Sequence, residues 1–103
     1  MKLPESHQKV MDLFVRFRSA VLSGDGKAFE ALCARDIAPQ VGLFQTNSER
    51  LRAAKLDLKL RKIEQEGQVA TASFDVVDEK GAKVDEGEVV TTEEPEGFRI
   101  RSL

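Results

Sequence analysis

Two glutamates, Glu86 and Glu88, have the residue type and spacing that general acid–base chemistry uses. Residues i and i+2 lie on one face of a strand, about 6.6–7 Å apart. Burial beside an apolar side chain raises the pKa of one carboxyl group, and a like-charged neighbour separates the two titrations. The pair is therefore a candidate acid and base for a small molecule. The same two acids could instead bind a cationic ligand without any chemistry.

Other reactive side chains are few. His7 is the only histidine and Cys33 the only cysteine, which excludes an internal disulfide and a cysteine-based zinc site in these residues. Cys33 follows Phe29 by one helical turn, which indicates a buried structural thiol. We expect His7 to be solvated near the start of a helix, and we expect neither a metal nor a cofactor.

Composition predicts one domain over residues 1–103, because a chain of 103 residues forms a single core.

A net charge of −2 argues against nonspecific electrostatic binding of nucleic acid. The charge is uneven: residues 50–62 hold six basic residues and one acid, whereas residues 75–96 hold nine acids and two lysines. This pattern indicates either neutralisation between neighbouring strands or an acidic face that docks on a basic partner.

No segment has the composition of a membrane span. The longest stretch without a charged side chain, residues 37–48, is interrupted by Pro39 and Gly42. It is well short of the roughly 18 apolar residues that a spanning helix needs. The first residues have no apolar core of a secretory signal. We therefore expect no membrane association and a cytoplasmic location, unless a leader has been removed.

Apolar residues at helical spacing predict a first helix over residues 5–23, ended by Gly24. Asp25 is placed to cap a second helix that ends near Arg35. Residues 36–46 show no clear period, and we expect a packed connector there. Thr46 and Glu49 have the spacing of a capping box, which predicts a short third helix over about residues 47–55.

From residue 56 the apolar period changes to two, which is typical of half-buried strands. We expect strands near residues 56–65, 69–78, 82–93 and 98–103. Turns at 78–81 and 94–97 each end in a glycine that can adopt positive φ. The chain is therefore predicted to have an α+β fold, with three N-terminal helices packed on a curved four-stranded antiparallel meander.

The turns also predict how the strands pair. Leu60 should lie opposite Phe74, with Leu58 opposite Val76 and Lys59 opposite Asp75. Val76 should lie opposite Val84, and Thr92 opposite Ile100, with Glu93 opposite Arg99. These registers place all even-numbered residues on one face.

On that face Glu86 would lie opposite Phe74, and Glu88 opposite Ala72. Burying two carboxylates in an apolar concavity costs several kcal/mol unless they are solvated or paired. The alternative is that an irregularity of the strand near Gly87 turns both side chains outward. The predicted pocket comprises Phe17, Phe44, Leu58, Ala72, Phe74, Glu86 and Glu88.

The opposite face of the predicted sheet carries short side chains that are only half polar. Such a face is either solvated or paired with another subunit, and symmetric dimers are the commonest oligomers. We expect a homodimer formed through the sheet. Its predicted interface residues are Thr71, Ser73, Val89 and Thr91.

Two segments resemble a known family. Residues 15–32, with an alanine, the Gly24-Asp25 break and a second helix, resemble the opening of nuclear transport factor 2-like (NTF2-like) domains, which are also called ketosteroid isomerase-like or cystatin-like. Residues 97–100, Gly-Phe-Arg-Ile, resemble the last strand of these domains. The resemblance implies a cone-shaped fold with a pocket at its open end, and frequently a dimer formed through the sheet. Family members include isomerases, dehydratases, hydrolases and domains that only bind, so the fold assigns no activity.

The chain departs from the catalytic sets of that family. A ketosteroid isomerase-like site uses a tyrosine beside its acids, and a scytalone dehydratase-like site combines tyrosine with histidine; this chain has no tyrosine. Our leading hypothesis is a non-enzymatic module that binds a small apolar or cationic ligand or a protein partner. One alternative is an isomerase, dehydratase or hydrolase that uses Glu86 and Glu88. A second alternative is an acidic accessory or immunity-type protein that docks on a basic partner.

Overall fold

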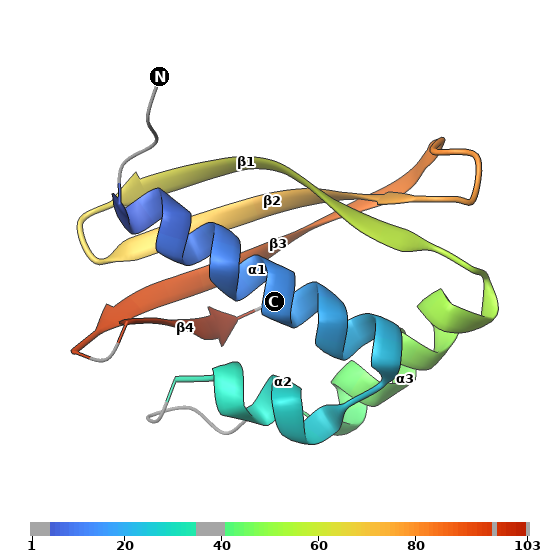
Figure 1. Ribbon diagram of the computed structural model, residues 1–103, viewed down its shortest axis with the longest axis horizontal. Coiled ribbons are helices and arrows are strands. Elements are labelled where there is room, and N and C mark those ends of the chain that lie inside the picture. The colour runs from blue at the N-terminus through green and yellow to red at the C-terminus, as the bar shows by residue number, and fades with distance from the viewer. Residues whose placement is uncertain (1–4, 35–40, 96, 103) are drawn as a thin grey trace.

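A computed structural model describes residues 5–34, 41–95 and 97–102 of the chain. Three helices precede a four-stranded antiparallel sheet of order β1-β2-β3-β4, and α1 lies across one face of that sheet (Figure 1). The predicted α+β fold is confirmed. The elements are α1 (Glu5–Ser23), α2 (Gly26–Leu32), α3 (Val41–Ala53), β1 (Asp57–Glu66), β2 (Val69–Val77), β3 (Lys83–Glu94) and β4 (Gly97–Ser102).

Helix α1 has the predicted bounds and buries the predicted apolar stripe against the sheet. Val10, Phe14, Phe17 and Val21 are all at most 5% exposed. The Asp25 side chain accepts the Ala28 N–H at 3.1 Å, so the predicted cap of α2 is confirmed. None of the helices in the described ranges is long and apolar enough to cross a membrane.

Helix α2 ends at Leu32, and the predicted end near Arg35 lies outside the described residues. Cys33 has extended backbone angles and forms a parallel bridge with Ile100. The Ala34 N–H donates to the Ile100 carbonyl at 2.8 Å. The chain after α2 therefore joins the sheet at the β4 edge.

Helix α3 begins at Val41, six residues earlier than predicted. Residues 41–46 are helical, so the predicted connector is wrong there, and its residues 36–40 lie outside the described part. The Thr46 hydroxyl donates to the Gly42 carbonyl at 3.0 Å within the helix, so Thr46 is not an N-cap. The helix extends this far because Phe44 stacks on Phe29, with ring centroids 4.2 Å apart.

The predicted pairing of β1 with β2 is confirmed at its first part. Leu58 lies opposite Val76, and Leu60 lies opposite Phe74. The register then shifts between Leu60 and Lys62, which leaves Arg61 as an extra residue. Such bulges increase the local twist of a sheet and so help it to curve around α1.

The pairing of β3 differs from the prediction by one residue. Val76 lies opposite Asp85, not Val84, because the register shifts between Val76 and Val77. Val84 is the extra residue and is 53% exposed. A shift of one residue exchanges the two faces of a strand. From Asp85 onward, the odd-numbered residues of β3 therefore lie on the face covered by the helices.

The predicted pairing of β3 with β4 is also wrong by one residue. Ile100 lies opposite Thr91, not Thr92, and Arg99 lies opposite Thr92, not Glu93. This register puts Ile100 and Phe98, which are 1% and 8% exposed, into the core. Leu58 and Ile100 belong to one cluster of buried side chains against which Phe74 packs, so the predicted common interior exists.

Candidate functional site

A cavity of about 510 Å³ lies between α1, α3 and the helix-covered face of the sheet. This volume is within the usual range of roughly 300–1,000 Å³ for small-molecule sites. Aromatic and aliphatic side chains form most of its wall, and polar residues gather at α3 and β3. The residues that line it are Phe17, Val21, Phe44, Asn47, Ser48, Arg50, Leu51, Ala54, Leu56, Leu58, Phe74, Val76, Asp85, Glu86, Gly87 and Glu88.

Helix α3 supplies one wall of the cavity. Phe44, Ser48 and Leu51 are separated by four and three residues and so share one helical face. Ser48 is 1% exposed, and its hydroxyl donates to the Val21 carbonyl near the end of α1. This bond satisfies the buried hydroxyl and ties the wall to α1.

Phe74 and Gly87 belong to the part of the cavity wall that the sheet supplies. Gly87 lies opposite Phe74, and a Cβ atom on residue 87 would be 2.6 Å from the Phe74 ring. The ring also packs against Phe14 and Phe17, with centroids 5.7 and 6.2 Å away. Glycine is therefore required at position 87, because any larger residue would displace this aromatic cluster.

Among the polar residues that border the cavity are Asn47, Arg50 and Asp85, none of which forms an ion pair with another described residue. Asn47 and Arg50 extend from α3, and Asp85 extends from β3 opposite the buried Val76. One oxygen of Asp85 accepts the backbone N–H of Glu86 at 2.8 Å. Among the described residues, neither the Arg50 guanidinium nor the Asp85 carboxylate has a charged partner. The border of the cavity thus has a positive group on α3 and, on β3, the Asp85 carboxylate beside Glu86 and Glu88.

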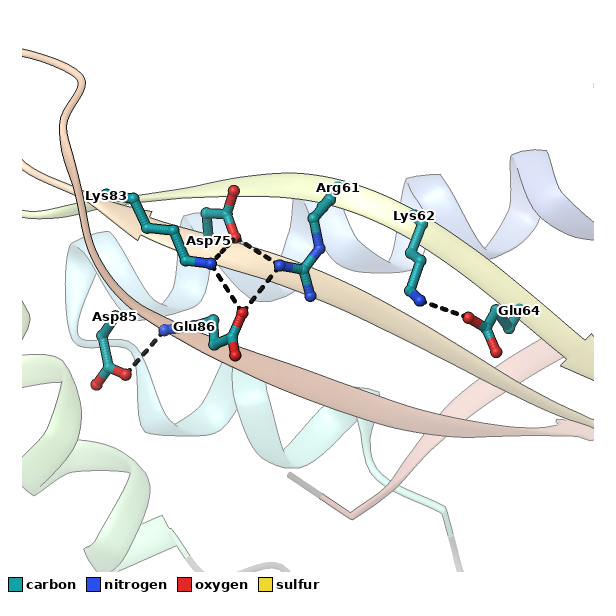
Figure 2. A network of polar contacts seen from close by, with 7 residues as sticks. All are labelled: Arg61, Lys62, Glu64, Asp75, Lys83, Asp85 and Glu86. Atoms are coloured by element: carbon teal, nitrogen blue, oxygen red, sulfur yellow. Dashed lines mark hydrogen bonds and ion pairs between the residues drawn. The ribbon is translucent and has the colours of Figure 1, made fainter.

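Glu86 and Glu88 turn outward, as the alternative to the predicted inward direction required, but the irregularity lies at Val84 and not at Gly87. Glu86 lies opposite Asp75, and Glu88 lies opposite Ser73, so Phe74 and Ala72 are not their partners. Although both residues border the cavity along β3, the Glu86 carboxylate lies on the face of the sheet that the helices leave uncovered, here called the open face (Figure 2). Glu88 follows Glu86 by two residues along β3, so its side chain lies on the same face.

Glu86 belongs to an exposed network of four charged residues. Its carboxylate accepts from Arg61 Nη1 and Lys83 Nζ, both at 2.9 Å, and Arg61 also donates to Asp75 at 3.1 Å (Figure 2). The hydrogen bonds from Lys83 and Arg61 lower the pKa of Glu86 to about 2. A carboxyl group with this pKa is ionised at neutral pH and is a poor proton donor and a weak base.

This network also explains the uneven charge of the sequence. Asp75 and Glu86 are neutralised by a residue of β1 and a residue of β3, and Glu94 of β3 lies 3.6 Å from Arg99 of β4. Three of the nine acids of residues 75–96, namely Asp75, Glu86 and Glu94, are thus paired within their own sheet, in the way that the first of the two interpretations describes.

Most residues of the predicted pocket do border this cavity. Phe17, Phe44, Leu58 and Phe74 line it, whereas Ala72 is 1% exposed and packs in the core away from it.

The residues predicted for the interface divide between the two faces of the sheet. Thr71 and Ser73 precede Asp75 by four and two residues along β2, so all three side chains share one face of the strand, the open face. Val89 and Thr91 lie on the helix-covered face, where each is 1% exposed, and the Thr91 hydroxyl donates to the Ala70 carbonyl at 2.7 Å. They cannot contribute to contacts through the open face. The one-residue shift of β3 puts Val90 and Thr92 there instead.

The other reactive side chains are not at the cavity. Cys33 is buried, its thiol donates to the Phe29 carbonyl at 3.4 Å, and burial raises its pKa. His7 is half-buried in the first turns of α1. Within the described ranges, no group of three or more His, Cys, Asp or Glu residues is arranged to hold a metal ion.

Sequence reasoning missed the polar border of the cavity. The predicted register places Asp85 on the opposite face, because it lacks the extra residue at Val84. Asn47 and Arg50 belong to the predicted helix over residues 47–55, but no pattern in the sequence indicates that this helix lines a cavity. The glycine at position 87 is the signal that would have helped, because it fits directly opposite the large Phe74 side chain.

Comparisons of the sequence found neither a matching family model nor a matching curated protein. Solved structures, by contrast, resemble the chain over nearly its full length. An NTF2-like protein of unknown function from Shewanella baltica has a TM-score of 0.72 at 10% identity, covering 97% of this chain and 91% of its own. An NTF2-like protein from Campylobacter jejuni, described as a candidate transpeptidase, has a TM-score of 0.69 at 13% identity, covering 90% and 97%.

A third structure, a candidate isomerase of the SnoaL-like family from Agrobacterium tumefaciens, has a TM-score of 0.64 at 14% identity and covers 90% of this chain and 92% of its own. At such low identity the likeness concerns the fold. The chain therefore has the NTF2-like fold, as the resemblance implied, and the assignments of these three proteins differ from one another.

Proposed function

We propose that this protein is a non-enzymatic binding module whose cavity between α1, α3 and the sheet holds a small, largely apolar molecule. The observation that carries this proposal is the cavity itself. It is about 510 Å³ in volume and is walled by Phe17, Phe44, Leu51 and Phe74. Apolar walls with few polar groups are typical of small-molecule sites. The module would act in the cytoplasm, where a single unpaired cysteine stays reduced.

The geometry favours binding over catalysis by paired carboxylates. That mechanism needs two acids on one side of a substrate, with at least one of them protonated. Glu86 points to the open face with a pKa of about 2, and Asp85 is on the helix-covered face. Docking of the acidic segment on a basic partner is disfavoured as well, because Asp75 and Glu86 already have basic partners within the sheet.

We further propose that the module is a homodimer formed through the open face of the sheet. Short side chains at the middle of β2 and β3, namely Thr71, Val90 and Thr92, would meet the same residues of a second copy. Val69 at the end of β2, which exposes 38% of its surface, would extend this contact, whereas Ser73 is only 2% exposed and would add little contact area. The charged network around Arg61 would lie at the border of that contact, where ion pairs remain hydrated.

Calorimetric titration with 2-naphthalenemethanol, a neutral bicyclic probe that the cavity can hold, tests the binding proposal. Binding is expected for the natural protein and should be abolished by Leu51→Trp, which fills the cavity. Leu43→Trp is the matched control: it places the same side chain on α3 at a residue that is 57% exposed and does not line the cavity.

Ala54→Phe at the α3 border gives a second means of blocking the cavity, should Leu51→Trp fail to fold. Far-ultraviolet circular dichroism would verify that each variant is folded. Binding that is equal in Leu51→Trp, Ala54→Phe and the natural protein would overturn the proposed function, and so would the absence of binding to the natural protein.

A further inference from the structure

We propose that the cavity selects a zwitterionic molecule, one with a carboxylate and an ammonium group on an apolar body. This inference rests on the proposed function and specifies the class of ligand. It derives from Arg50 and Asp85, two opposite charges that border the same cavity on different elements.

The two charges are available to a ligand. Among the described residues, Arg50 forms no side-chain hydrogen bond or ion pair, and Asp85 uses one oxygen to accept the Glu86 N–H and leaves the other unused. The two residues do not form an ion pair with each other either. Arg61, Lys83 and Glu86 of the sheet, by contrast, are paired with one another and are not available in this way.

Arg50 is suited to a carboxylate. A guanidinium group presents two parallel N–H donors that match the two oxygens of a carboxylate. Asn47 precedes Arg50 by three residues, lies on the neighbouring part of α3 and lines the cavity too, so its amide can add a further donor.

The Asp85 carboxylate can pair with an ammonium group of a ligand, and it repels a ligand group that is negatively charged. Asp85 lies opposite Val76 on the helix-covered face, and two further acids of β3, Glu86 and Glu88, also border the cavity. Of these neighbours, Glu86 is neutralised by Lys83 and Arg61, and Glu88 points to the open face. A ligand with one negative and one positive end matches both borders, whereas a simple anion or a simple cation matches only one.

The test compares four probes that share a naphthalene body at neutral pH: 6-(aminomethyl)-2-naphthoic acid, 2-naphthoic acid, 2-naphthylmethylamine and 2-naphthalenemethanol. Their affinities for the full chain are measured by titration calorimetry. Each partly exposed charge pair should strengthen binding by about fivefold, so the zwitterion should bind roughly 20-fold more tightly than the neutral alcohol.

Two variants assign the effect to the named residues. Arg50→Gln should remove the advantage of the carboxylate and leave that of the ammonium group, and Asp85→Asn should do the reverse. Arg52→Gln and Glu49→Gln are the controls. The Arg52 guanidinium lies against Gly24, Glu49 is exposed on α3, and neither residue lines the cavity, so neither change should alter the order of the probes.

The outcomes separate the two proposals. Equal binding of all four probes would overturn the zwitterion inference and leave the apolar cavity supported. Tighter binding that depends on only one of the two charged groups would have the same consequence. No binding of any probe would overturn the proposed function as well. An unchanged preference in Arg50→Gln and Asp85→Asn would also refute the inference, because the selectivity would then come from other residues.

Discussion

Gly87 lies directly opposite Phe74 in the pairing of β2 with β3, and the Phe74 ring occupies the space that a side chain at residue 87 would fill. This relationship sets which residues of β3 face the cavity. With Gly87 in register with Phe74, Asp85 and Val89 lie on the helix-covered face, while Glu86 and Glu88 lie on the other. Of the acidic residues of β3 that border the cavity, Asp85 is therefore the one on the helix-covered face.

Gly87→Ala should destabilise the protein by about 1–3 kcal/mol, the usual cost of adding a methyl group to a well-packed region. The new Cβ would lie 2.6 Å from the Phe74 ring, which cannot move without disturbing Phe14 and Phe17. Urea unfolding of the two proteins measures the change. In the Phe74→Leu background, the same substitution should cost less, since the ring is absent.

Gly42→Ala is the matched control for that experiment. Gly42 lies inside α3 and has open space around the position of a Cβ atom. Alanine should therefore stabilise the helix by about 0.5–1 kcal/mol. Equal effects of the two substitutions on the free energy of unfolding would contradict the role assigned to Gly87.

Much of the fold could be predicted from the sequence, because local signals sufficed for it. The apolar stripe of α1, the Asp25 cap and the alternation of the strands each follow from periodicity or turn chemistry. The pairing of Leu60 with Phe74 followed from the same rules and is confirmed. These features depend on neighbouring residues and require no knowledge of the tertiary structure.

The site was less predictable, because it depends on single-residue irregularities. One extra residue at Val84 puts Asp85 and Thr91 on the helix-covered face and Glu86 on the open face. Bulges have no strong sequence signature, since tertiary packing decides where the extra residue lies. The start of α3 was missed for a similar reason: the stacking of Phe44 on Phe29 is a tertiary contact.

Replacing Glu86 with Gln should lower stability at neutral pH, and the difference should shrink in acid. Lys83 and Arg61 lower the pKa of Glu86 from 4.5 to about 2, so folding favours its charged form. That stabilisation is present above about pH 5 and is lost as the pH falls toward 2. Melting temperatures of the two proteins at several pH values test this expectation.

Glu88→Gln is the control for the pH series, since no ion pair to Glu88 is present among the described residues. Its melting temperature should differ little from that of the natural protein at neutral pH. A Glu86→Gln difference that stays constant from pH 7 to pH 3 would show that the network with Lys83 and Arg61 does not stabilise the fold.

Arg18→Lys should weaken the attachment of α1 to β1. Arg18 donates to both oxygens of Asp57, at 2.7 and 2.8 Å, and lysine cannot reproduce this paired geometry. Because the two side chains are 41% and 45% exposed, the expected loss is only about 0.5 kcal/mol. Urea unfolding measures this loss, and Arg16→Lys, at an exposed position on the same helix, is the control. An equal loss of stability in the two variants would contradict the role assigned to the Arg18–Asp57 pair.

Thr71→Lys should convert the proposed homodimer into a monomer. Lysine at the centre of the open face would meet the same charge of the second copy, and its burial would carry a desolvation cost. Sedimentation velocity should give about twice the chain mass of 11.4 kDa for the natural protein. Gln68→Lys, in the exposed turn between β1 and β2, should leave the dimer intact; a monomeric natural protein would refute the interface.

The most direct test of the binding proposal is a two-dimensional ¹H–¹⁵N NMR titration of the full chain with 2-naphthalenemethanol. The account predicts that the largest shift changes cluster at Leu51, Phe74 and Gly87, with little change at Val90 and Thr92 on the open face. Changes confined to the open face, or no saturable change at any residue, would contradict the claim that this cavity is the functional site.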